Sequence, residues 1–198
     1  MRTMSRRDAL RSLSAASLVL PLSAMETTAQ GAVRPVAWAR PIALAGVPNL
    51  HAMAKNIYRS AQPRAEGFIA LATRYGVKTV ISMRANHEDD DLVEGLDMRA
   101  LRFPTDTWHI RRASVIGALR TLRQTAQTEP VLLHCQHGAD RTGLVAALYR
   151  IMYENWSKDA ALDEMINGGF GYHAIWGNIP RFIERFDVER LRREVGEL

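Results

Sequence analysis

Apolar residues recur along the chain in two patterns, which predict strands alternating with helices from residue 56 onward. Short apolar runs predict strands at residues 56–60, 77–83, 100–103 and 130–133. Apolar positions three or four residues apart predict helices at residues 64–75, 113–127, 142–154 and 158–166, with a last helix between Asn178 and Arg193. Because strands alternate with helices, we expect an α/β fold, a single domain with a mostly parallel central sheet flanked by helices.

Composition divides the chain into three segments. Residues 1–29 combine the pair Arg6 and Arg7 with a short apolar stretch and small residues around Ala29, a pattern typical of a twin-arginine export signal. Residues 30–55 are rich in Ala, Pro and Gly and are interpreted as a linker or N-terminal extension. Residues 56–198 form the predicted folded domain. The alternative for the first segment is an amphipathic N-terminal helix or an uncleaved anchor.

Charge narrows the classes of partner. The net charge of the chain is +5; four arginines and two acids in the first 29 residues account for +2, which leaves +3 for the rest. A mildly basic domain suits anionic substrates. The sequence shows no basic stripe interleaved with aromatic residues, so it does not predict binding to a nucleic acid. We expect an exported, periplasmic protein with no stable membrane span after processing; a cytoplasmic or membrane-anchored protein is the alternative.

The segment that carries the chemistry is residues 134–143, His-Cys-Gln-His-Gly-Ala-Asp-Arg-Thr-Gly, which joins a predicted buried strand to a predicted helix and holds the only cysteine. Backbone amides of such a turn, together with the N-terminus of the helix, form a site for a phosphate dianion. Gly138 supplies the backbone freedom for a tight turn. Arg141 offers a planar fork for two phosphate oxygens. The expected site is therefore an anion-binding loop with a cysteine at its start.

The same positive field favours the thiolate of Cys135, which is a competent nucleophile without a neighbouring base. Thr142 is placed to donate a hydrogen bond to the sulfur and to help it leave in a second step. We expect His134 to organise the loop through hydrogen bonds rather than to abstract a proton.

Three other roles are open to the cysteine. It is a small buried hydrophobe in most proteins, but the Gly, Arg and Thr at fixed offsets argue against that role here. A zinc site would use the crowded set His134, Cys135, His137 and Asp140, yet adjacent residues of one tight loop point in different directions. A redox role lacks a second cysteine to resolve a disulfide. We therefore expect no metal and no organic cofactor.

These residues resemble the signature loop of the cysteine-dependent protein phosphatases, His-Cys-x-x-Gly-x-x-Arg-Thr/Ser, and most closely that of bacterial dual-specificity-type enzymes. Two further segments resemble that group, Tyr58–Pro63 and Lys78–Arg84. The resemblance implies a protein tyrosine phosphatase-like fold with the phosphate-binding loop after the central strand. It also implies catalytic roles for Cys135, Arg141 and Thr142. The residues that it places around the substrate are His134, Gln136, His137, Gly138, Ala139 and Asp140.

A phosphatase of this kind also needs an acid to protonate the leaving oxygen. Asp106 follows a predicted strand at about the place where the family carries its acid, although the Trp-Pro-Asp order of related enzymes is missing. Its rivals are Asp97, His109 and the acidic run 88–91, which is interpreted as a solvated loop. Four further side chains are weaker candidates for lining the pocket: Arg84, Trp108, Tyr172 and His173. A surface salt bridge is the alternative role for Arg84, and packing in the core is the alternative for the aromatic residues Trp108 and Tyr172.

Taken together, the sequence predicts a phosphomonoester hydrolase that acts through a phosphocysteine intermediate. The expected partner is a phosphorylated protein with phosphotyrosine, with or without phosphoserine and phosphothreonine. An inositol phosphate or phosphoinositide phosphatase is the alternative, and Asp140, together with the lack of lysines in the loop, argues against so charged a head group. A non-catalytic phospho-binding module is the third candidate, and it would not need the nucleophile.

Overall fold

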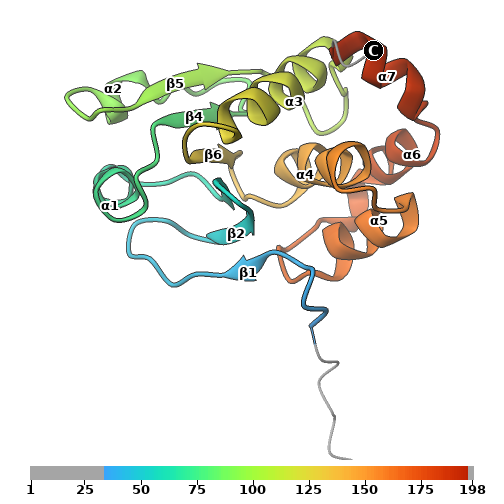
Figure 1. Cartoon of the computed structure of the whole chain (residues 1–198), viewed down its shortest axis with the longest axis horizontal. Helices are drawn as coiled ribbons and strands as arrows, with labels where there is room; N and C mark the ends of the chain where they lie inside the picture. Colours follow the sequence, from blue (N-terminus) through green and yellow to red (C-terminus); the bar gives the residue numbers. More distant parts are fainter. Residues whose placement is uncertain (1–33, 196–198) are drawn as a thin grey trace, which may run out of the picture. The chain divides into compact units, whose positions relative to one another are not determined.

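The computed structural model describes residues 34–195, and six strands within that range form one sheet (Figure 1). The strand order across the sheet is β1-β2-β3-β6-β4-β5. The strands are β1 Arg40–Pro41, β2 His51–Ala54, β3 Ile57–Ser60, β4 Thr79–Ser82, β5 Arg99–Arg102 and β6 Val131–His134. Strands β3, β6, β4 and β5 run parallel, whereas β1 and β2 are antiparallel additions at one edge. The predicted α/β fold with a mostly parallel sheet is confirmed.

Helices cover both faces of the sheet. They are α1 Ala65–Tyr75, α2 Asp90–Val93, α3 Arg112–Ala126, α4 Asp140–Tyr153, α5 Lys158–Asn167, α6 Asn178–Glu184 and α7 Val188–Val195, with a 3₁₀ turn η1 at Ala174–Trp176. One apolar core joins the sheet to α3, α4, α5, α6 and α7, and a second joins it to α1 and α2 (Figure 1). Neighbours in β6 alternate between them, because Leu132 belongs to the second core and Leu133 to the first.

The central strand β6 delivers the cysteine loop to the middle of the sheet. It lies between β3 and β4, and His134 at its end pairs in register with Ser60 and Ser82 at the ends of those strands. The carboxyl ends of three parallel strands therefore meet at Cys135, which is where open α/β sheets bind ligands.

The linker predicted for residues 30–55 differs from what the structure shows for its described part. Strands β1 and β2 lie in this segment and pair with each other, and β2 pairs with β3. Both strands are short, two residues in β1 and four in β2, so neither produces a strong alternating pattern. The segment thus extends the sheet beyond the boundary expected at residue 56.

The C-terminal helix and the acidic run also differ from expectation. The single helix expected between Asn178 and Arg193 is two helices, α6 and α7, separated by residues 185–187. Asn178 is the first residue of α6 rather than a cap with a side-chain hydrogen bond. The acidic run 88–91 includes the start of α2, and Asp89 within it is buried.

The predicted export signal at residues 1–29 lies outside the described part of the chain. Within residues 34–195, none of the helices combines the length and the apolar character that crossing a membrane requires.

Candidate active site

The loop between β6 and α4 turns sharply at Gly138, and the sequence folds this way because that position is a glycine. Its backbone has φ +71°, and a Cβ atom there would lie 2.5 Å from the carbonyl carbon of Ser60 and from the backbone nitrogen of Ala61. Both the backbone conformation and the close approach to the end of β3 exclude a side chain. Gly138 therefore lets the loop curl back over the strand ends.

Cys135 lies in this loop with 1% of its surface exposed, and its thiol is free. Two neighbouring groups are buried without a hydrogen-bond partner among the described residues, Nε of Arg141 and Oγ1 of Thr142. The Arg141 guanidinium has one long bond, from Nη1 to the carbonyl oxygen of Thr105 at 3.5 Å. Buried donors are nearly always paired in proteins. Donors left free beside a buried thiol are placed to bond an oxyanion.

His134 is held inside the protein by Asp89, which sequence reasoning placed in a solvated loop. Nε2 of His134 lies 2.9 Å from Oδ2 of Asp89, and these two side chains are 0% and 1% exposed. Gln62 donates to the other oxygen of Asp89 at 2.7 Å. Burial raises the pKa of Asp89, but the bonds from His134 and Gln62 outweigh it and lower that pKa below its usual value. His134 thus organises the loop from behind and does not line the cavity.

Arg59 supports the loop from β3. Its side chain is fully buried; Nη2 donates to the carbonyl oxygen of Gly138 at 2.8 Å, and the guanidinium lies 3.6 Å from the centre of the Phe170 ring. Burial lowers the pKa of Arg59 to about 10, so the group remains a cation at neutral pH. The charge of Glu164 counteracts that shift, and so does a negative charge on Cys135, so this buried cation adds to the positive field at the sulfur. In the sequence Arg59 stood out only as part of the Tyr58–Pro63 segment.

A cavity of about 420 Å³ opens beside the loop. Its walls come from four parts of the chain, the end of β4, the segment after β5, the cysteine loop and the segment before α6. The lining includes Arg84, Asp106, Trp108, Gln136, His137, Arg141, His173 and Trp176. Of the six residues that the sequence placed around the substrate, Gln136, His137 and Asp140 line the cavity, whereas His134, Gly138 and Ala139 are buried and do not.

Asp106 is the carboxylate of this cavity that lies after a strand, as expected for the acid. Its side chain is 18% exposed, and Oδ2 lies 3.7 Å from Nη2 of Arg111. The adjacent Thr105 fixes the segment, because its hydroxyl accepts from the backbone nitrogen of Arg111 at 2.8 Å and its carbonyl accepts from Arg141. Asp106 is therefore held on the same segment that contacts the arginine of the loop.

The rival acids lie elsewhere. The carboxylate of Asp97 is 88% exposed and pairs with Lys78. Glu88 pairs with Arg102 at 2.7 Å on the surface. His109 lines a different cavity from the one beside the loop. Asp106 is the candidate that the geometry leaves.

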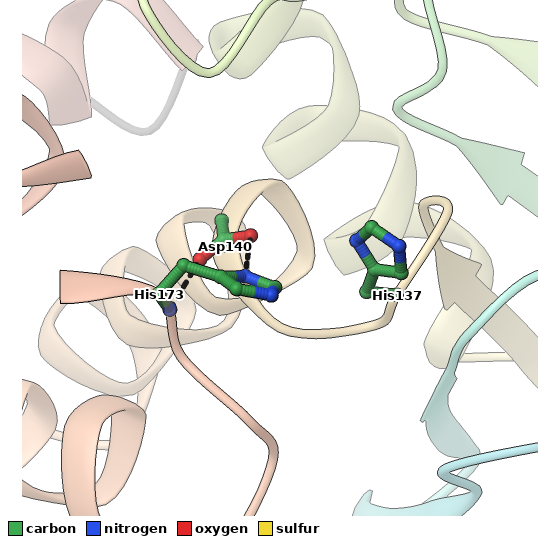
Figure 2. Close-up of side chains that lie close together, drawn as sticks. All are labelled: His137, Asp140 and His173. Atoms are coloured by element: carbon green, nitrogen blue, oxygen red, sulfur yellow. Dashed lines mark hydrogen bonds and ion pairs between the residues drawn. The ribbon is translucent and has the colours of Figure 1, made fainter. Parts of the chain in front are cut away.

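Asp140 lines the cavity, and its side chain is also hydrogen-bonded within the protein (Figure 2). Its carboxylate accepts hydrogen bonds from the backbone nitrogen of His173 at 2.9 Å and from Nδ1 of the same residue at 2.8 Å. The His137 ring lies 5.3 Å from that of His173, between ring centres. Asp140 thereby ties His173 to the start of α4, and the imidazoles of His137 and His173 both line the cavity. Both oxygens of the Asp140 carboxylate accept hydrogen bonds from His173, so Asp140 is expected to repel a polyanion less than its sequence suggests.

The quartet weighed as a zinc site is not assembled, because His134 points to Asp89 rather than toward His137 and Asp140. A different set, His137, Asp140 and His173, has its potential ligand atoms within 4.8 Å of one another. Both oxygens of Asp140 already accept bonds from His173, so this set is a hydrogen-bonded cluster in the present arrangement.

Several residues of the site escaped sequence reasoning. Asn49, in the segment read as a linker, donates from Nδ2 to the carbonyl oxygens of His137 and Phe170, both at 2.9 Å. Trp176 lines the cavity with Trp108, whereas Tyr172 does not line it and donates to the carbonyl oxygen of Trp176 at 3.0 Å. The positive φ of +56° at Asn49 is typical of asparagine in a turn, but that pattern alone does not reveal a partner 88 residues away.

Comparisons with known proteins agree with this geometry. A family model described as the tyrosine phosphatase family matches residues 47–195. The dual specificity protein phosphatase TpbA of Pseudomonas aeruginosa is 40% identical over 172 residues, 87% of this chain and 76% of that protein. A crystal structure of a cysteine-to-serine variant of P. aeruginosa TpbA in complex with pTyr has a TM-score of 0.73 at 37% identity and covers 83% of this chain and 99% of that one.

A relative with a different printed activity is also similar. The inositol diphosphatase DSP5 of Arabidopsis thaliana is 30% identical over 159 residues, which are 74% of this chain and 73% of that protein.

Proposed function

Because this chain belongs to the tyrosine phosphatase family, we propose that it hydrolyses phosphotyrosine in a phosphorylated protein, with or without phosphoserine and phosphothreonine. Family membership confirms the resemblance predicted from residues 134–143 and the predicted enzyme class, a cysteine-dependent phosphatase. The observation that carries the proposal is the buried thiol of Cys135 beside the free donors of Arg141 and Thr142 at the start of α4.

In the proposed first step Cys135 attacks phosphorus. The bond between Sγ and phosphorus forms while the bond from phosphorus to the tyrosyl oxygen breaks. The carboxylic acid of Asp106 gives its proton to that oxygen. Arg141 and the loop amides stabilise the charge on the equatorial oxygens, an electrostatic contribution that is usually the largest in such reactions.

In the second step water attacks the phosphocysteine. The Asp106 carboxylate takes a proton from the water as the new phosphorus–oxygen bond forms and the sulfur–phosphorus bond breaks. The hydroxyl of Thr142 donates a hydrogen bond that stabilises the departing thiolate. Apart from the substrate and this water, the groups that take part in these two steps belong to the chain.

The inositol phosphate alternative gains support from one contact. Because Asp140 is engaged by His173, the loop is less hostile to a polyanion than its sequence suggested. The test compares kcat/KM of the purified protein on a phosphotyrosine peptide, a phosphoserine peptide and an inositol diphosphate. We expect the phosphotyrosine peptide to give the highest value. A higher kcat/KM on the inositol diphosphate would overturn the substrate assignment. If the protein hydrolysed none of the three compounds, the proposed phosphatase activity itself would be wrong.

We further propose that the enzyme works in the periplasm, on the strength of Arg6, Arg7 and the apolar stretch that follows them. Replacing both arginines by lysine should leave active protein in the cytoplasm of a bacterial host, measured as phosphatase activity in separated cell fractions. Unchanged periplasmic activity would contradict twin-arginine export.

A further inference from the structure

A second cavity of about 500 Å³ adjoins the candidate active site and has no part in the proposed chemistry. The two cavities share Trp108, whose side chain is exposed. Asn178 at the start of α6 donates from Nδ2 to the carbonyl oxygen of Thr107 at 2.7 Å, which fixes the second cavity to the segment that carries Asp106. A substrate that extends from the first cavity past Trp108 therefore reaches the second cavity.

The second cavity is rich in cations, because Arg112, Arg181, Arg185 and Arg190 line it, against a single lining carboxylate, that of Asp187. Two of them already have a carboxylate, since Glu194 accepts from Arg112 at 2.7 Å and from Arg190 at 2.8 Å. Arg181 and Arg185 are exposed, and neither has a carboxylate within ion-pair distance among the residues that the structure describes. The cavity thus presents two guanidinium groups that are available to an anionic ligand.

Part of the lining of this cavity is apolar. Phe182 and Phe186 line it with their ring centres 5.9 Å apart, and Ile110 also lines it. A polyphosphate head group would gain nothing from these apolar side chains, whereas a peptide can place apolar side chains on the rings and carboxylates on the arginines. The combination of chemistry favours an acidic peptide.

We propose that this second cavity binds an acidic stretch of the phosphoprotein substrate, next to the phosphorylated residue. The proposal rests on the proposed function, because it names the flanking sequence that the same active site prefers. Arg181 and Arg185 contact only the flanking residues, in the ground state and in the transition state alike. They are therefore expected to act on KM and to leave kcat unchanged.

The experiment uses two phosphotyrosine peptides that differ only in their flanks, which carry glutamate in one and glutamine in the other. We expect Arg181→Gln and Arg185→Gln each to lower kcat/KM on the glutamate peptide about twofold to fivefold, the range of exposed ion pairs. The double variant should lose roughly the product of the two factors. Added salt should shrink the difference, because exposed charges are screened.

Controls separate this proposal from the function on which it rests. Arg74→Gln removes an exposed arginine of α1, away from both cavities, and should change nothing. Hydrolysis of p-nitrophenyl phosphate should be equal in all variants. Equal kcat/KM on the two peptides, or an equal loss on both in the double variant, would overturn the acidic site while leaving the phosphatase intact. A loss confined to an inositol polyphosphate would also overturn it. No hydrolysis of either peptide would overturn the proposed function and this site with it.

Discussion

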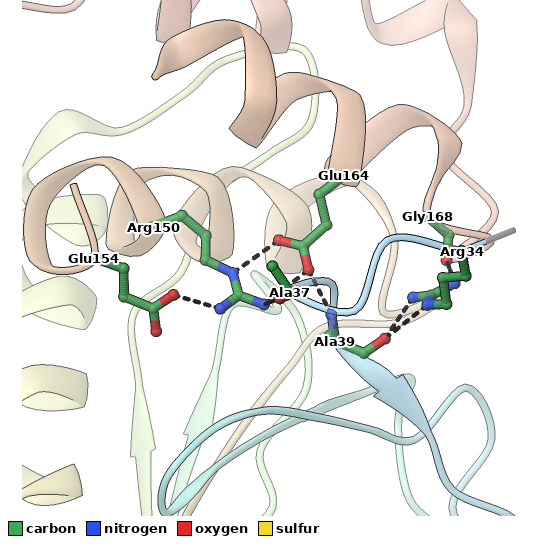
Figure 3. Close-up of polar contacts among 7 residues, drawn as sticks. All are labelled: Arg34, Ala37, Ala39, Arg150, Glu154, Glu164 and Gly168. Carbon is green, nitrogen blue, oxygen red and sulfur yellow. Dashed lines mark hydrogen bonds and ion pairs between the residues drawn. The ribbon is translucent and has the colours of Figure 1, made fainter. Parts of the chain in front are cut away.

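Helix α4 carries an arginine at each end, and the two are bonded in opposite ways. Arg150 in its last turn bonds through all three guanidinium nitrogens, two of them to Glu164 at 2.8 and 2.9 Å and one to Glu154, with a further bond to the carbonyl oxygen of Ala37 (Figure 3). Arg141 in the first turn has one bond, at 3.5 Å, and a buried Nε with no partner in the described chain.

The two ends of α4 have different roles, and this explains why their arginines differ in hydrogen bonding. Around Arg150 the network fastens residues 34–39 to α5, because Glu164 also accepts from the backbone nitrogen of Ala39 at 2.6 Å (Figure 3). A buried donor without a partner costs about 1–3 kcal/mol, and the N-terminal end of α4 tolerates that cost. One helix thus carries two different arginines. Arg150 is fully hydrogen-bonded and stabilises the fold, so we call its end of α4 the saturated end. Arg141 keeps free donors that can bind an oxyanion, and its end is the unsaturated end.

The largest effects are expected for Arg141→Ala and Asp106→Asn, and Arg141→Ala tests the free donors at the N-terminal end of α4. Loss of the guanidinium should lower kcat/KM by at least roughly 10²–10³-fold, the usual effect of removing one oxyanion donor. The free energy of unfolding should hardly change, because no carboxylate loses its partner. Activity assays and urea unfolding of the same preparation measure the two quantities. If Arg141→Ala unfolded more readily yet kept its activity, Arg141 would serve stability rather than catalysis, which contradicts the role given to it here.

Asp106→Asn tests the second chemical group at the same end. We expect kcat to fall by about 10²–10⁴-fold on a phosphotyrosine peptide, the range of general acid catalysis. The fall should be smaller on p-nitrophenyl phosphate, because its phenolate is a better leaving group that needs less help from a proton. Asp97→Asn, at an exposed ion pair, serves as the matched control. If Asp106→Asn and Asp97→Asn behaved alike on the phosphotyrosine peptide, the acid would have to lie elsewhere.

The saturated end should respond in stability alone. Arg150→Met leaves the buried carboxylate of Glu164 without its partner, and we expect a loss of about 3–5 kcal/mol in the free energy of unfolding. Adding Glu164→Gln should recover part of that loss. Activity per folded molecule should stay near that of the parent chain. A fall in kcat at full folding would show that the two ends of α4 are not independent.

Asp89→Asn gives the smallest expected effect and refines the description of the loop end. The pKa of Asp89 is lowered in the folded protein, so its contribution to stability is present above the unfolded value of about 4 and is lost as pH falls through the folded pKa. At neutral pH we expect the variant to be less stable by about 1.5–3 kcal/mol, as for bonds to charged groups. Urea unfolding from pH 7 to pH 3 should show this gap closing. A gap that is constant with pH would mean that the charge of Asp89 contributes nothing.

These two ends also mark how far the sequence alone predicts the molecule. The loop was predictable because its chemistry lies in contiguous residues, a buried strand, Cys135, Gly138 and Arg141, and local geometry follows from local sequence. Asp89 was not, because in sequence it belongs to an acidic run, and only its contact with His134, 45 residues away, buries it. A helix pattern likewise cannot show that α6 and α7 separate at residues 185–187.

The segment before β3 illustrates the same limit. Strands of two and four residues carry little periodicity, so β1 and β2 are recognised only from their pairing with each other and with β3. Asn49 reaches the cysteine loop from that segment, and no pattern in the sequence links it to His137. Sequence therefore predicts the nucleophile and its loop, whereas the tertiary structure supplies the groups that hold the loop in place.

The most direct test of the central claim is to trap the phosphorylated enzyme. The protein is mixed with a phosphotyrosine peptide, quenched in acid within one turnover, digested and analysed by mass spectrometry. The account predicts one phosphoryl group on Cys135, none in Cys135→Ser, and binding of the peptide retained by that variant without turnover. Turnover that persists in Cys135→Ser, or a phosphoryl group found on another residue, would contradict it.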